Sequence, residues 1–154
     1  MSWTTPITDR TQEDVDYVRL LNSLKWSEMT AQQQADFTHQ LKGALNTSDL
    51  VRIYANINEI NDLYGIGMQA ISLTYGKYLT TKIWTDIRDA LRTIRLRCPA
   101  YPTTPEVPTG MAQYGQINDI EQILQDAYDI YQEVLKDRRY VGETYTHEGW
   151  LDLI

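Results

Sequence analysis

The chain is poor in the residues that build covalent or metal-held frameworks. Among its 154 residues there is one cysteine, Cys98, and there are two histidines, His39 and His147. One thiol cannot close an internal disulfide, and these three residues show none of the paired spacings that are typical of structural zinc. We therefore expect no disulfide, no metal and no cofactor.

Long apolar runs are also absent. No stretch reaches the roughly 18 apolar residues of a membrane span, and no charged-then-apolar leader opens the chain. Hydrophobic residues make up 42% and charged residues 23% of the chain, as in an average globular domain. These values predict one domain with neither a signal peptide nor a membrane partner.

Catalytic motifs are missing as well. The run 65–67 lacks the further glycine or the Lys-Ser/Thr pair of a phosphate loop, and no Gly-x-Ser-x-Gly turn occurs. His147 beside Glu148 is the best candidate for acid–base chemistry, but it has no nearby nucleophile and would need a formed pocket. Cys98 follows Arg97, which would favour a thiolate, yet a buried structural cysteine is the simpler interpretation. We expect a protein that is not an enzyme.

The charge is present in blocks. The net charge is −7, yet residues 66–97 carry six basic and two acidic residues, between acidic segments on both sides. The basic block either neutralises its neighbours or steers an acidic partner, and the sequence leaves both open. The total also argues weakly against a nucleic-acid partner.

Helical spacing of apolar residues predicts an all-α helical bundle of about five helices. Candidate N-caps are Asp9 or Thr11, Thr30, Asn46 with Thr47 and Ser48, and Thr80 or Thr81, and Gly43 and Gly65 are candidate ends. Residues 66–79 suggest a short helix or a helical turn. The expected helices are one of about 14 residues that starts near Asp9 or Thr11, one over about 30–42, one from the cap at 46–48 to Tyr64, one from Thr80 or Thr81 to about 97, and one over about 116–138.

Between the last two helices, four prolines recur at every third position, which favours a stiff polyproline II segment. In the last helix, Asp126, Asp129 and Glu133 have the spacing of a solvated face. The predicted layout is an extended arm (1–10), a helical region (11–97), a Pro-rich linker (98–115), a long helix (116–138) and a docking tail, irregular or a short hairpin (139–154).

The aromatic residues fall into two groups. There are 11 tyrosines and four tryptophans against one phenylalanine, and such amphipathic rings are common at interfaces. Tyr64, Trp84, Tyr128 and Tyr131 occupy helix faces and are predicted core residues. Those at the chain ends are predicted subunit contacts, although the arm could equally fold onto its own domain. The predicted contact residues are Trp3, Pro6, Tyr145 and Trp150.

One face of the predicted helix 81–97 is basic. Arg88, Arg92 and Arg95 lie at helical spacing opposite its apolar residues, and we predict an electrostatic patch there. The alternative function is a phage-encoded module that binds nucleic acid or a host factor through these arginines. Nucleic acid is the less favoured partner, because acidic residues share the helix and no DNA-reading motif accompanies it.

Four stretches resemble small structural proteins encoded in the tail-gene region of phages and prophages of Gram-positive bacteria. They are Trp3-Thr4-Thr5-Pro6-Ile7-Thr8-Asp9-Arg10-Thr11 with Asp14-Val15, Lys42-Gly43-Ala44-Leu45-Asn46 running into Asp49-Leu50-Val51-Arg52-Ile53 and Asn56-Ile57, Asn118-Asp119-Ile120-Glu121-Gln122-Ile123-Leu124, and Gly142-Glu143-Thr144-Tyr145-Thr146-His147-Glu148. The match departs at Val51 and Tyr54, where similar proteins tend to have Asn and Glu.

The resemblance implies a virion component of the tail tip, baseplate or fibre attachment, assembled in the host cytoplasm. Its implied partners are other tail or baseplate proteins. Because tail components form rings, a homo-oligomer is also expected. On this view, deleting residues 1–10 would block incorporation into particles while leaving the helices intact.

Overall fold

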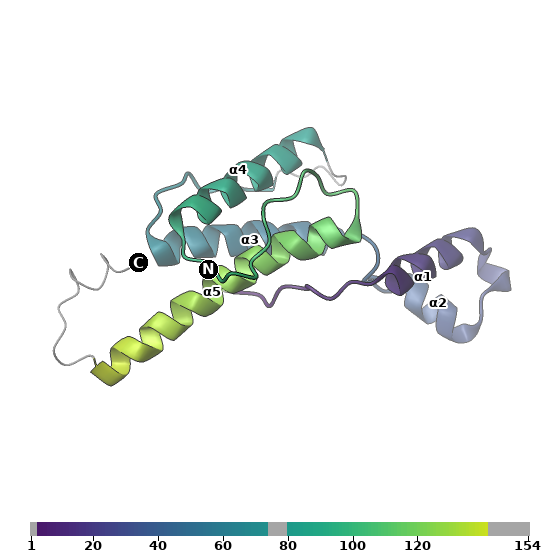
Figure 1. Ribbon diagram of the computed structural model, residues 1–154. Helices are drawn as coiled ribbons and strands as arrows, with labels where there is room; N and C mark the ends of the chain where they lie inside the picture. Colours follow the sequence, from purple (N-terminus) through teal and green to yellow (C-terminus); the bar gives the residue numbers. More distant parts are fainter. Residues whose placement is uncertain (1–2, 74–79, 142–154) are drawn as a thin grey trace.

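A computed structural model of the chain describes residues 3–73 and 80–141, with the side chains of 138–141 excepted. Within these residues it contains α-helices, one 3₁₀ helix and no strand, which confirms the expected all-α class (Figure 1). The elements are α1 (Gln12–Ser23), η1 (Trp26–Glu28), α2 (Ala31–Thr38), α3 (Thr47–Tyr64), α4 (Thr81–Arg97) and α5 (Tyr114–Val141).

Most helix boundaries follow from local capping. The hydroxyls of Thr11, Thr30 and Thr80 each accept a hydrogen bond from a backbone N–H in the first turn of α1, α2 and α4, so Thr11 rather than Asp9, and Thr80 rather than Thr81, is the cap. Gly65 ends α3 in the left-handed conformation, with φ of 60°, which glycine adopts without steric cost. These boundaries depend on contacts within a few residues.

Two local expectations were wrong. α2 ends at Thr38 rather than near Gly43. Gly43 instead approaches the backbone of α1 so closely that a Cβ atom would overlap the carbonyl group of Asp14. Of the expected short helix over 66–79, residues 66–73 are irregular rather than helical, and side chains of α3 bond the backbone of Met68 and Ile71; residues 74–79 lie outside the described part of the chain.

Helices α3, α4 and α5 pack against one another and enclose the core (Figure 1). Their buried faces are rich in isoleucine, and the predicted core aromatics Tyr64, Trp84 and Tyr128 pack at the margin of this core, half-buried. The most deeply buried apolar side chains of the three helices are Ile53, Ile57, Ile60, Ile87, Leu91, Ile94, Ile120, Ile123 and Leu124.

The three bundle helices run in the same direction, each beginning at the end nearer α1 and α2 (Figure 1). The hydroxyl of Tyr54 donates to Asp86, which joins the first half of α3 to the first half of α4. Arg52 similarly joins the start of α3 to Glu121, near the start of α5. Parallel neighbours require that the chain return along the bundle between successive helices, so the connections are long and extended.

The Pro-rich segment is one of these returns, and it packs along α5. Thr104 is buried, and its hydroxyl donates to Asp126 at 2.6 Å, while the hydroxyl of Tyr101 donates to Glu133. Asp126 is therefore buried rather than part of a solvated face, which corrects that expectation. The segment connects two helices that touch each other.

Asparagine side chains hold the extended segments against the helices. The Asn58 amide donates to the carbonyl of Ile71 at 2.7 Å and accepts from its N–H at 3.0 Å. Asn61 makes the same two bonds with Met68. Each side-chain amide thus satisfies a donor and an acceptor that a strand neighbour would satisfy in a sheet.

We expect Asn58→Ala to lower the free energy of unfolding by about 1–3 kcal/mol, because it leaves the polar groups of Ile71 without their partner. Asn22→Ala, in the exposed part of α1, is the matched control and should change it by less than about 0.5 kcal/mol. Urea unfolding followed by circular dichroism measures both values. Equal effects of the two substitutions would contradict this role of Asn58.

Candidate functional site

The N-terminal arm lies on the chain's own bundle. The ring of Trp3 stacks on Tyr128 with centroids 4.1 Å apart and planes 3° from parallel. The amide of Asn56 forms a two-bond pair with Thr4, and Pro6 is buried. Trp3 and Pro6 thus contact their own chain, which is the alternative in which the arm folds onto its own domain. Their part in a contact with another subunit stays a prediction.

The inner end of the arm enters a buried network of four charges. Arg10 contacts Glu121 at 2.7 Å and Asp49 at 3.1 Å. Arg52 contacts the same two carboxylates, Glu121 at 2.6 Å and Asp49 at 2.7 Å. Burial of a single ion would be costly, but two arginines and two carboxylates sum to zero charge.

This network joins the arm to α3 and α5 at the end where both helices begin. The side chains of Arg10, Asp49 and Glu121 are at most 4% exposed. Asn118 adds a fourth amide pair, with the backbone N–H and carbonyl of Arg10. The contacts with Asp49 and Glu121 raise the pKa of Arg52 in spite of its desolvation, so it stays charged. The arrangement specifies one position for the arm.

We expect Arg10→Met to lower the free energy of unfolding by about 3–5 kcal/mol, because it leaves two buried carboxylates with one arginine. Arg19→Met is the control, since Arg19 is 73% exposed and lies 3.8 Å from Asp16, and it should cost less than about 1 kcal/mol. Thermal and urea unfolding report the difference. A loss for Arg10→Met no larger than that of the control would contradict a structural role for the network.

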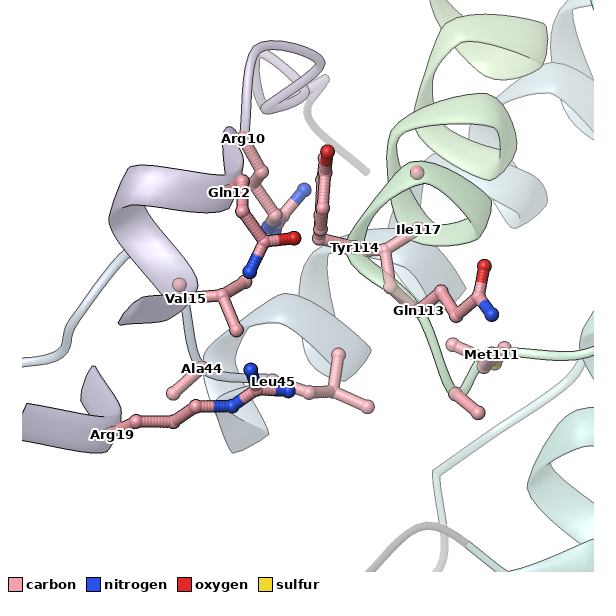
Figure 2. Close-up of a pocket in the computed structure, with 13 residues that line it drawn as sticks. Arg10, Gln12, Val15, Arg19, Ala44, Leu45, Met111, Gln113, Tyr114 and Ile117 are labelled. Carbon is pink, nitrogen blue, oxygen red and sulfur yellow. The ribbon is translucent and has the colours of Figure 1, made fainter. Parts of the chain in front are cut away.

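A pocket of about 580 Å³ lies between α1, the loop before α3 and the start of α5 (Figure 2). Figure 2 shows Arg19 and Leu45 along one side and Tyr114 facing the arm. None of the described residues that line it is a histidine, cysteine, aspartate or glutamate. The two terminal nitrogens of Arg10 are already engaged by Ile7, Glu121 and Asp49, whereas its buried Nε has no hydrogen-bond partner among the described residues.

Gly43 lines this pocket and sets the distance between the loop and α1. We expect Gly43→Ala to lower the free energy of unfolding by about 1–3 kcal/mol, because the added Cβ must displace the backbone near Asp14. Gly115→Ala is the control: its Cβ meets nothing within 4 Å, and alanine favours the helix, so stability should be unchanged or rise by up to about 1 kcal/mol. Differential scanning calorimetry compares the two, and a stable Gly43→Ala variant would refute the close approach.

The second surface feature is the hairpin formed by α1, η1 and α2, which projects beyond one end of the bundle (Figure 1). Three large apolar side chains on it are exposed: Leu20 by 46%, Trp26 by 52% and Phe37 by 44%. Trp26 and Phe37 meet edge to face, with ring centroids 6.4 Å apart. Only Leu21 and Met29 are buried apolar residues of the hairpin, so it buries little apolar surface of its own.

The predicted arginine patch is largely paired. Arg88 contacts Asp89 at 3.0 Å, and Arg95 contacts Glu106 of the Pro-rich return at 2.9 Å. Arg92 is exposed and makes no ion pair with the residues that the structure describes. The basic block therefore neutralises nearby acidic groups in part, as in the alternative in which it balances its own acidic neighbours.

Of the remaining candidate residues, Cys98 lies in the described part of the chain and the others lie outside it. Cys98 is buried, and burial raises the pKa of its thiol to about 12, against the smaller opposite effect of Arg97. The thiol is therefore protonated at neutral pH, consistent with the structural interpretation. Tyr145, Trp150, His147 and Glu148 lie outside the described residues, so their predicted roles stay predictions.

Sequence reasoning missed the asparagine pairs, the charge network and the exposed hairpin. The sequence does hold a signal for the asparagine pairs: Asn56, Asn58 and Asn61 interrupt an apolar helix, although asparagine has a low helix propensity.

In the described ranges 3–73 and 80–141, no cluster of histidine, cysteine and carboxylate suits a metal, and no helix is long and apolar enough to cross a membrane. Comparison with known proteins finds no matching family model, curated protein or solved structure.

Proposed function

We propose that the protein is a non-enzymatic structural subunit of a phage tail, baseplate or fibre attachment. It acts through contacts with other tail or baseplate proteins and with further copies of itself in a ring. It is assembled in the host cytoplasm and is retained in the virion. The resemblance of four stretches to proteins encoded by tail genes supports this proposal.

The observation that carries it is the exposed hairpin. Leu20, Trp26 and Phe37 are all 44–52% exposed on one small projection, and aromatic residues of this kind are enriched where proteins bind one another. The hairpin is attached to a bundle whose isoleucine-rich faces pack against one another. A packed bundle with an apolar projection suits a subunit that is held by its neighbours.

The nucleic-acid alternative has less support. A phosphate contact needs an unengaged cation, but Arg88 and Arg95 already face carboxylates at 3.0 and 2.9 Å. Arg92 alone of the predicted patch is exposed without an ion pair in the described part of the chain. We therefore keep the structural role as the proposed function.

Mass spectrometry of purified virions or tail particles tests the role, and we expect the protein in the particle. A Trp26→Ser/Phe37→Ser variant should be incorporated at least tenfold less, because it loses the apolar projection. Val51→Ser is the control, since Val51 is 52% exposed on α3, away from the hairpin. Deleting the arm is a poorer test, because it also removes Arg10 from the buried network. Absence of the wild-type protein from the particle would overturn the proposal.

A further inference from the structure

We propose that copies of this chain associate head to tail, with the hairpin of one copy seated on the C-terminal end of α4 of the next. The occupant of the apolar hairpin surface is thus a second copy of the chain. This inference rests on the proposed function only in taking the protein to be a structural subunit. The contact itself is inferred from the two surfaces.

Four of the five large exposed apolar side chains in the described part of the chain lie at these two places, and the fifth is Val51 of α3. Leu20, Trp26 and Phe37 belong to the hairpin, and Leu96, 84% exposed, belongs to the last turn of α4. Burying the hairpin side chains against Leu96 of another copy would remove most of this exposed apolar surface from water.

The two surfaces also carry opposite charge. Residues 11–42 hold five acidic and three basic residues, a net charge of −2. Residues 91–97 hold three arginines and no acidic residue. Arg92 and Arg97 are exposed and form no ion pair with any described residue, so they remain available to an acidic partner. Complementary charge favours this pairing over hairpin with hairpin.

The surfaces lie at opposite ends of the molecule. The hairpin projects from the end where α3 and α5 begin (Figure 1). Because α4 runs parallel to both, its last turn with Leu96 lies at the other end. One chain therefore cannot bring its own two surfaces together, whereas successive copies can. A contact between two different surfaces is heterologous and repeats into a ring or an open array.

The test measures the mass of the purified full chain in solution by sedimentation velocity over a range of concentrations. We expect wild-type mass to rise above one chain with concentration. A hairpin variant (Trp26→Ser/Phe37→Ser) and an α4 variant (Leu96→Ser/Arg92→Glu) should each associate at least tenfold more weakly. Val51→Ser, at an exposed apolar site outside both surfaces, should associate as wild type does. Helical circular dichroism and thermal unfolding confirm that all variants fold.

An equimolar mixture of the hairpin variant and the α4 variant is the decisive sample. Each retains the surface that the other has lost, so one intact hairpin meets one intact α4 end, and a species of two chains should form. A wild-type chain that stays monomeric, a mixture that stays monomeric, or an equal loss with Val51→Ser would overturn the contact. Association that survives both variants but is lost on removal of residues 142–154 would also overturn it. None of these results bears on presence in the virion, which the particle experiment tests separately.

Discussion

The structure depends on satisfying the backbone of extended segments in a protein whose described part contains no sheet. Three parallel helices need long return connections, and the arm adds a further extended stretch. The backbone N–H and carbonyl groups of these segments have no neighbouring strand to bond, and a buried polar group without a hydrogen-bond partner is costly. Asparagine amides of α3 and α5 supply both a donor and an acceptor to four positions on these segments: Thr4, Arg10, Met68 and Ile71.

The same arrangement explains the buried charges. Arg10 arrives on the arm, and its charge is balanced by Asp49 of α3 and Glu121 of α5, which Arg52 also contacts. The network joins three segments that are distant in sequence at the end where two helices begin. It makes the arm part of the bundle, and the hairpin projects beyond it (Figure 1).

Local features of the fold were predictable, and long-range ones were not. Thr11, Thr30 and Thr80 indicated helix starts because an N-cap bonds an amide only three residues away. Asp126 was misassigned to a solvated face because its partner, Thr104, comes from a return segment whose path the sequence does not reveal. Gly43 indicates a helix end by sequence alone, because its real constraint, the backbone of α1, lies far along the chain. The hairpin's exposure was missed because helical spacing alone does not say which apolar residues find a neighbour.

The amino-acid sequence by itself determined the all-α class, the approximate starts of the helices and the end of α3 at Gly65, since these follow from propensity, apolar spacing and hydrogen bonds within one turn. Only the tertiary structure decided that α3, α4 and α5 are parallel, that the arm lies on its own bundle, and that the basic face is largely paired. These outcomes depend on contacts between segments that lie tens of residues apart in the sequence. The attraction within a pair such as Arg10 and Glu121 strengthens once packing has excluded water from both.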